Sequence, residues 1–135
     1  MGKKIITDIN IRFRDIDSMG HVNNAVFFTY FEEGRKDFLR LLFNIVAPEE
    51  YNFILAHLSC DFLKPIKISD HISLQLWAGE IGTKRFDLVY AIVDRNDEST
   101  VYAKGRSVQI FFDYKKNTTK PIPPFFLDKI SEYTN

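Results

Sequence analysis

Residues 24–44, NAVFFTYFEEGRKDFLRLLFN, decide the fold, because their apolar side chains recur at the spacing of an α-helix. One stripe of this helix consists of Phe27, Phe31, Phe38 and Leu42. Further aromatic and leucine side chains widen the stripe well beyond one face. A helix that is apolar over most of its girth needs cover on several sides, so we predict that the rest of the chain wraps around it.

The beginning of this helix is marked by Asn23, a residue type that caps helices well. With Asn23 as the cap, Val22 and Phe27 occupy the two positions of a hydrophobic staple. Gly34 lies in the middle of the helix, where glycine costs about 1 kcal/mol relative to alanine. We expect another backbone to approach closely at this position.

The remainder of the chain is predicted to form β-strands. Residues 5–13 alternate between apolar and polar side chains, with Ile11 and Phe13 on the apolar side, as in a half-buried strand. Further strands are predicted at residues 53–63, 72–77, 86–92 and 101–112. The connections between the last three have the length of hairpins, so neighbouring strands should be antiparallel.

One long helix and one antiparallel sheet make a single α+β domain over residues 1–135. A loop containing Pro48 follows the helix, and a proline cluster near residue 121 ends the sheet before a short C-terminal helix. Because the helix is apolar nearly all round, we expect the sheet to curl around it.

The composition excludes several classes of protein. The chain has 18 basic and 18 acidic residues, and this balance argues against a dedicated nucleic-acid binder. No apolar stretch has the length of a signal peptide core or of a membrane span. A single cysteine fits a reducing compartment, so we expect a cytoplasmic protein. The 13 phenylalanines indicate a bulky core, or an apolar surface kept for a subunit or ligand.

The loop before the helix carries the residues that suggest chemistry. Asp17 and His21 immediately precede the helix N-terminus, which offers unpaired N–H groups and a partial positive charge. The amides of Asn24 and Ala25 are the expected donors to an oxyanion. A carboxylate beside them can attack a carbonyl or take a proton from water. The competing interpretation is an ordinary turn, because Asp, Gly and Asn favour turns and Asn23 is explained by capping alone.

The motif D-x-D-x-x-G-H-V-N-N at residues 15–24 resembles the hotdog-fold acyl-CoA thioesterases, including the 4-hydroxybenzoyl-CoA thioesterase-like group. It is also similar to part of the plant acyl-ACP thioesterases. The likeness continues in YFEEGR at residues 30–35, in CDFLKPIKISDHISL at residues 60–74 and in GRSVQIF at residues 105–111. The resemblance covers almost the whole chain. It implies the hotdog fold, an antiparallel sheet wrapped around one long helix.

The resemblance also implies roles for individual residues. The family's catalytic acid falls on Asp17 and its oxyanion donor falls on the backbone N–H of Asn24, while His21 and Asn23 match the signature. Met19 departs from the plant enzymes, which have an asparagine there that helps to hold the acid. A second departure is Phe27, where many members have tyrosine.

Several charged residues have two interpretations. Glu32 could face the active site across a subunit boundary or form a surface pair with Arg35. Lys84 and Arg85, and also Lys64, could bind CoA phosphates or could be solvated surface charges. Together with Asn23 and Phe27, we take Glu32, Lys84 and Arg85 as candidate substrate-binding residues. Asp15 is expected to be structural.

Other kinds of site lack support in the sequence. The three histidines have no spacing typical of metal ligands, and the chain contains neither paired cysteines nor the H-E-x-x-H motif. A serine hydrolase is not indicated, because G-x-S-x-G is absent. Cys60 alternates with apolar neighbours and is expected to act as a small buried hydrophobe. We therefore expect no metal and no cofactor beyond the CoA of the substrate.

These observations lead us to expect an acyl-CoA thioesterase that works as a homodimer or homotetramer. Asp17 would be nucleophile or general base, His21 would orient it or the water, and Asn24 would stabilise the oxyanion. The carrier could be CoA or acyl carrier protein. Two alternatives stay open, a hotdog dehydratase or hydratase acting on acyl thioesters and a non-catalytic acyl-CoA binding protein. We expect neither a nucleic acid nor a membrane as a partner.

Overall fold

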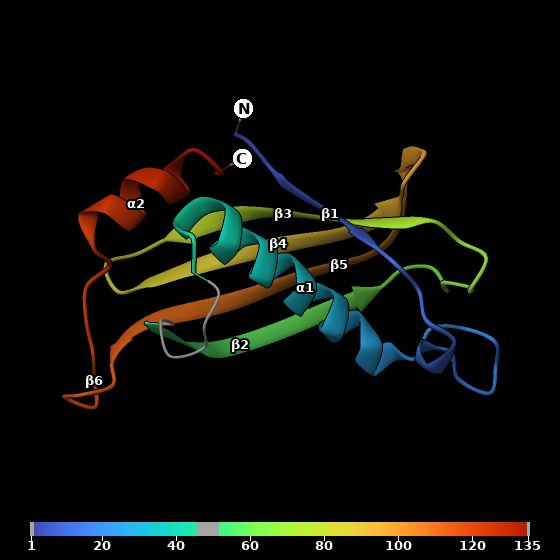
Figure 1. Ribbon diagram of the computed structural model, residues 1–135, viewed down its shortest axis with the longest axis horizontal. Coiled ribbons are helices and arrows are strands. Elements are labelled where there is room, and N and C mark those ends of the chain that lie inside the picture. Colours follow the sequence, from blue (N-terminus) through green and yellow to red (C-terminus); the bar gives the residue numbers. More distant parts are fainter. Residues whose placement is uncertain (1, 46–51, 135) are drawn as a thin grey trace.

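The computed structural model describes residues 2–45 and 52–134, in which one long helix lies across one face of an antiparallel sheet (Figure 1). The helices are α1 (Asn24–Phe43) and α2 (Pro124–Ser131), and a 3₁₀ turn, η1 (Phe13–Asp15), precedes α1. The strands are β1 (Ile5–Ile9), β2 (Phe53–Phe62), β3 (Ile72–Ile81), β4 (Arg85–Asp94), β5 (Asp97–Asp113) and β6 (Thr118–Thr119). The predicted α+β class is confirmed, and the loop predicted around Pro48 lies outside the described residues.

The sheet has the order β1-β3-β4-β5-β2, and the short strand β6 pairs with the end of β5. All of these pairings are antiparallel. The predicted hairpins therefore form the centre of the sheet, β3-β4-β5. The strands on either side of α1 in the sequence, β1 and β2, form the two edges. Most side chains of the edge strand β2 are exposed.

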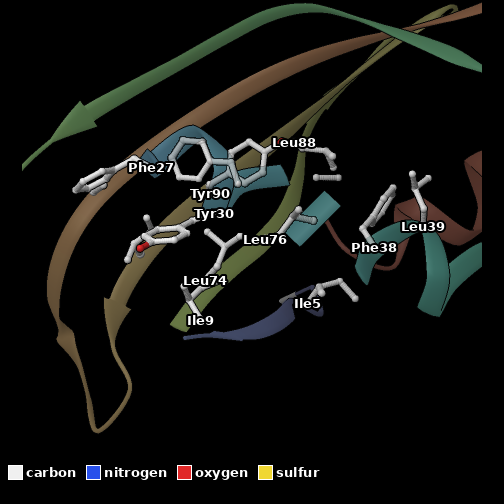
Figure 2. Packing of buried hydrophobic residues seen from close by; sticks show 14 of the residues in the cluster. Ile5, Ile9, Phe27, Tyr30, Phe38, Leu39, Leu74, Leu76, Leu88 and Tyr90 are labelled. Carbon is white, nitrogen blue, oxygen red and sulfur yellow. The ribbon is translucent and has the colours of Figure 1, made fainter. Parts of the chain in front are cut away.

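The core lies between α1 and the central strands. Figure 2 shows side chains of α1 directed at the sheet, where Leu74 and Leu76 of β3 and Leu88 and Tyr90 of β4 meet them. The ring of Phe31 stacks on that of Tyr90, with 4.4 Å between centroids. Phe31 also lies directly over Gly105 of β5, where even one added methyl group would collide with the ring. The Phe31 side chain of α1 is thus in contact with the backbone of β5.

Gly34 also allows a close contact between α1 and the sheet, but its neighbour differs from the one expected. Its buried position faces the side chains of Leu74 and Leu76, so a leucine rather than another backbone occupies the space of the missing side chain. The expectation of a backbone neighbour was wrong, because β3 presents its apolar face to α1. Near the C-terminal end of the helix Leu41 is 57% exposed, so a single chain leaves part of the apolar girth uncovered.

The first strand is shorter than predicted. It ends at Ile9, and Phe13 is 86% exposed instead of buried. The alternating pattern continues past Ile9, but local hydrogen bonds turn the chain. The N–H of Asp15 donates to the carbonyl of Arg12 at 2.9 Å, and the N–H of Arg12 donates to the Asp15 carboxylate at 2.9 Å. This turn directs the chain toward the beginning of α1.

Polar side chains between α1 and the sheet form a continuous chain of hydrogen bonds. The guanidinium of Arg35 donates to the Tyr90 hydroxyl at 3.1 Å, and that hydroxyl is 2.5 Å from the hydroxyl of Ser107. Ser107 in turn bonds the amide oxygen of Gln109, whose nitrogen donates to the carbonyl of Phe86 at 3.0 Å. These partners explain how polar groups are tolerated in the core.

Across the described ranges, neither helix is both long and apolar enough to span a membrane.

The contact at Gly105 gives a test of the packing. We expect Gly105→Ala to lower the free energy of unfolding by about 1–3 kcal/mol, because the methyl group would meet the Phe31 ring and the Ser59 carbonyl oxygen 2.8 Å away. Urea denaturation measures this loss. Gly79→Ala is the control in the same sheet, because its methyl group would meet only side chains, the nearest at 3.1 Å. Equal stabilities of the two variants would contradict the packing described.

Candidate active site

The loop between η1 and α1 is a tight turn closed by backbone hydrogen bonds. The N–H of Asp17 donates to the carbonyl of His21 at 2.8 Å, and the N–H of Gly20 donates to the carbonyl of Asp17 at 3.0 Å. Gly20 has a φ of 81°, a conformation that glycine adopts without strain. The sequence D-S-M-G-H therefore folds back on itself and holds Asp17 beside His21.

The carboxylate of Asp17 is oriented by main-chain groups. Its Oδ1 accepts the N–H of Met19 at 2.9 Å and the N–H of His21 at 3.4 Å. Its Oδ2 has no hydrogen-bond partner within residues 2–45 and 52–134. The backbone of Met19 thus supplies a contact to the acid at a position where the plant enzymes have an asparagine side chain. His21 contacts Asp17 through its backbone and not through its imidazole.

The N-terminus of α1 leaves one amide available next to this carboxylate. Asn23 caps the helix as predicted, and its Oδ1 accepts the N–H of Ala25 at 2.9 Å. Ala25 is therefore not a free donor, contrary to the expectation from the sequence. The N–H of Asn24 has no acceptor in the described part of the chain. Of the two amides expected to bind an oxyanion, only that of Asn24 is available.

Asp17, His21, Asn24 and Phe27 line one cavity of about 230 Å³. Met19 and Val22 complete this side, and the facing wall consists of Phe62, Leu63, Lys64 and Pro65. We call this the Asp17 cavity. A hydrogen bond of 2.8 Å from the N–H of Val22 to the carbonyl of Ile66 holds the two segments together. The cavity thus combines a carboxylate and a free amide at one end with aromatic and aliphatic walls.

A buried pair beneath the loop sets its position, and sequence reasoning missed half of it. Asp15 is buried, and its carboxylate accepts the hydroxyl of Tyr30 at 2.8 Å in addition to the N–H of Arg12. Burial, and then the bond to Asp15, raise the pKa of Tyr30 well above its usual range. The backbone carbonyl of Asp15 accepts the N–H of Asn23 at 2.9 Å. Asp15 therefore ties the loop to both the N-cap and the second turn of α1.

The remaining predicted residues lie outside the Asp17 cavity of a single chain. Asn23 is used as the helix cap, and Glu32 is an exposed residue of α1 with no ion-pair partner among the described side chains. Lys84 donates to Thr119 at 3.2 Å, and Arg85 pairs with Asp87 at 2.8 Å. Arg85 is in register with Ile110, whereas Phe62 at the cavity is in register with Ala103. These positions are about 23 Å apart along β5, at about 3.3 Å per residue.

Other reactive groups have less suitable surroundings. Burial raises the pKa of the Cys60 thiol to about 11, so it is protonated and a poor nucleophile at neutral pH. Among the described residues, no three His, Cys, Asp or Glu side chains are grouped as metal ligands would be. Asp17 is the one acidic residue among the described residues that line the Asp17 cavity.

Comparison with known proteins assigns the family. Residues 11–130 match the model of the thioesterase-like superfamily. The chain belongs to this superfamily. A Bacillus subtilis (strain 168) protein, the uncharacterized YsmA, is 26% identical over 82 residues, which are 61% of this chain and 56% of YsmA. The chain thus spans little more than half the length of that relative.

Several solved structures share the fold of this chain. A predicted thioesterase from Bacillus stearothermophilus matches with a TM-score of 0.90 at 22% identity, over 98% of both chains. A 1,4-dihydroxy-2-naphthoyl-CoA thioesterase from Synechocystis matches with a TM-score of 0.82 at 20% identity, over 96% of this chain and 97% of its own. A Thermus thermophilus thioesterase complexed with coenzyme A and Zn has a TM-score of 0.79 at 26% identity, over 93% and 95%. The predicted hotdog fold is confirmed.

The pair of Asp15 and Tyr30 yields a prediction about stability. We expect Tyr30→Phe to lower the free energy of unfolding at pH 7 by about 1–3 kcal/mol, because a buried carboxylate loses a donor. The folded-state pKa of Tyr30 is raised, so its contribution is complete below the ordinary tyrosine pKa of about 10 and declines at higher pH. Denaturation curves at pH 7 and above pH 10 measure both effects.

Tyr102→Phe is the matched control for this prediction. The hydroxyl of Tyr102 is 3.5 Å from the Asp94 carboxylate, a distance at which a hydrogen bond is weak. A loss of stability as large in Tyr102→Phe as in Tyr30→Phe would show that the buried pair has no special importance.

Proposed function

We propose that the chain hydrolyses an acyl-CoA thioester to a free acid and CoA in the Asp17 cavity. One observation carries the proposal. The Asp17 carboxylate and the unpaired N–H of Asn24 line the same cavity, so a carbonyl group between them would meet a nucleophile or base on one side and an oxyanion donor on the other. Membership of the thioesterase-like superfamily supports the same reaction.

The proposed reaction begins when an oxygen adds to the thioester carbonyl carbon. That oxygen comes from the Asp17 carboxylate itself or from a water molecule whose proton Asp17 accepts. The carbonyl oxygen gains negative charge and accepts the N–H of Asn24 at the positive end of the α1 dipole. The C–S bond then breaks, the sulfur leaves as a thiolate, and it takes up a proton. On the nucleophilic route, water subsequently cleaves the mixed anhydride and frees Asp17.

The expected rate effects are sufficient for an activated substrate. One preorganised oxyanion donor contributes roughly 10²–10³ in rate, and a positioned base contributes roughly 10²–10⁴. A carboxylate is a weak base at neutral pH, which favours direct attack by Asp17. His21 contributes a backbone N–H to Asp17, and the residue itself lines the cavity. The proposed reaction needs neither a metal nor a cofactor.

The walls of the Asp17 cavity suit an acyl-CoA. Phe27, Phe62 and Leu63 offer apolar contacts to the acyl group, and the Lys64 ammonium offers a charge to the phosphates. A structural relative from Thermus thermophilus was solved with coenzyme A, which supports CoA as the carrier here. With its single cysteine, the chain is best suited to the cytoplasm.

A second copy of the chain would complete the structure. Within residues 2–45 and 52–134, strand β2 pairs only with β5, and Leu55 on it is 46% exposed, so we infer that its outer edge pairs with the same strand of another copy. We propose a homodimer formed along β2, which can associate further into a tetramer. None of Glu32, Lys84 and Arg85 lines the Asp17 cavity of its own chain, so in this proposal they act at the Asp17 cavity of a neighbouring copy.

Substitution of Asp17 tests the reaction. We expect Asp17→Asn to lower kcat by roughly 10²–10⁴ with a smaller change in KM, because the amide can neither attack nor accept the proton. Thiol release from a panel of acyl-CoAs of graded chain length, with an aromatic one included, measures this change. Asp128→Asn, at an exposed position of α2, should leave kcat unchanged.

The same samples distinguish the alternatives. Hydration of an enoyl thioester without thiol release would establish a hydratase. Acyl-CoA binding without turnover in the parent protein, kept in Asp17→Asn, would establish a binding protein. Single-turnover hydrolysis in ¹⁸O-water separates the two hydrolytic routes, because label in the Asp17 carboxylate identifies nucleophilic attack.

Light scattering tests the assembly. At micromolar concentration we expect at least a dimer of the 15.8 kDa chain. Leu55→Lys should shift it to monomers, because a lysine on a paired edge opposes its own copy. Ile6→Lys places the same charge on an exposed position of the other edge strand, β1, and should leave the dimer intact. A monomeric parent protein would refute the proposed interface.

A further inference from the structure

A second cavity, larger than the Asp17 cavity, lies at the opposite end of α1. Its volume is about 490 Å³. The walls include five phenylalanines from four elements or their flanks, which are Phe43, Phe53, Phe111, Phe125 and Phe126. We call this the Phe126 cavity. In Figure 1 its elements, the end of α1, the beginning of β2, the end of β5 and α2, lie together at the end of the molecule away from the loop that carries Asp17.

The two cavities are separate sites. They share no lining residue. Asn24 at one and Phe43 at the other are the first and last residues of α1, about 28 Å apart at 1.5 Å per residue. The core aromatic Phe31, which is fully buried, lies between them. The Phe126 cavity is therefore not an extension of the acyl end of the Asp17 cavity.

Contacts between rings hold the walls of the Phe126 cavity in place. Phe43 stacks on Phe126 with 4.2 Å between centroids, and Phe111 meets Phe126 edge to face at 4.7 Å. Phe125 on the wall is 68% exposed, so the cavity is an apolar concavity open to the surface and accessible to a ligand. Its volume is in the range of small-molecule sites, so an apolar ligand gains free energy by leaving water for it.

Positive charge at this cavity indicates the chemistry of the ligand's polar end. Lys120 lines it, and its ammonium makes no hydrogen bond or ion pair with the described side chains. The charge of Lys120 contributes to the lowered pKa of Asp113, after the N–H of Lys116, but no ion pair joins the two side chains within the described residues. The first turn of α2 also borders the cavity and has no acidic residue or side-chain cap. One cation beside an apolar chamber suits a monoanion with an apolar body.

We propose that the Phe126 cavity binds a free carboxylic acid with an aliphatic body, its carboxylate on Lys120 and its chain among the phenylalanines. At about 30 Å³ for a group of the size of a water molecule, the chamber has room for at most roughly sixteen heavy atoms, enough for decanoate. The inference does not depend on the proposed hydrolase activity. If that activity holds, the ligand belongs to the same chemical class as the acid that the reaction releases.

An NMR titration of the full chain with decanoate tests the proposal. We expect saturable shifts of the backbone amides of Lys120, Phe125 and Phe126, and smaller ones at Met19 and Asn24. Lys120→Met should weaken decanoate binding about tenfold, because a charge-assisted hydrogen bond is lost. The same variant should change the affinity for uncharged decan-1-ol by less than about twofold, because the apolar walls remain. Lys115→Met, in the turn after β5, is the matched control and should bind decanoate as the parent does.

Ile45→Trp provides a second, independent variant, because a larger side chain on the wall fills the chamber. It should reduce binding of both decanoate and decan-1-ol, with a dispersed spectrum as the sign that the chain is folded. Three results would overturn the proposal: no saturable binding to the parent, shifts confined to the Asp17 cavity, or equal affinity in Lys120→Met and parent. Shifts of the same amides with protein concentration alone would assign the chamber to a contact between copies, and would overturn it too.

Discussion

The packing of Phe31 on Tyr90 and Gly105 fixes the helix on the sheet, and the geometry of the candidate site depends on it. Phe31 is fully buried, and because Gly105 has no side chain, its ring reaches the backbone of β5. A helix seated this closely cannot slide or rotate without opening a cavity. Its neighbour in the sequence, Tyr30, thereby holds Asp15 in place. The position of Asp15 in turn fixes that of the loop that carries Asp17. The position of the free amide of Asn24 is determined in the same way, two turns earlier on the same helix.

Patterns of local spacing were sufficient to predict most of the elements. The helix predicted at residues 24–44 is Asn24–Phe43, and the hairpins β3-β4-β5 agree with the lengths of their connections. The first strand shows the limit of such patterns. Alternation alone extends it to Phe13, but the bonds between Arg12 and Asp15 turn the chain first. The order of the edge strands was also beyond prediction, because β1 and β2 find their partners through contacts far apart in the sequence.

The candidate site likewise has a part that local sequence predicts and a part that depends on contacts between distant segments. Asp17, His21 and Asn24 follow from a short motif and from the rule that helix N-termini have unpaired amides. The facing wall at residues 62–65 depends on the bond between Val22 and Ile66, and the support from Tyr30 depends on a fold that buries Asp15. Neither has a local signal. Glu32, Lys84 and Arg85 carry suitable charges, but charge in a sequence contains no information about distance, and these residues lie elsewhere in a single chain.

The way in which Asp17 is held has a consequence for how such a protein can diversify. Its carboxylate is oriented by the N–H groups of residues 19 and 21, which every amino acid except proline possesses. Met19 is 75% exposed and borders the Asp17 cavity, so its side chain can be exchanged while the grip on the acid persists. In the proposed reaction, a substitution at residue 19 would therefore alter the entrance to the Asp17 cavity without changing how the acid is held. On that proposal, the backbone of the five-residue turn at residues 17–21 would position the reactive acid, and the side chain at residue 19 would shape the substrate entrance.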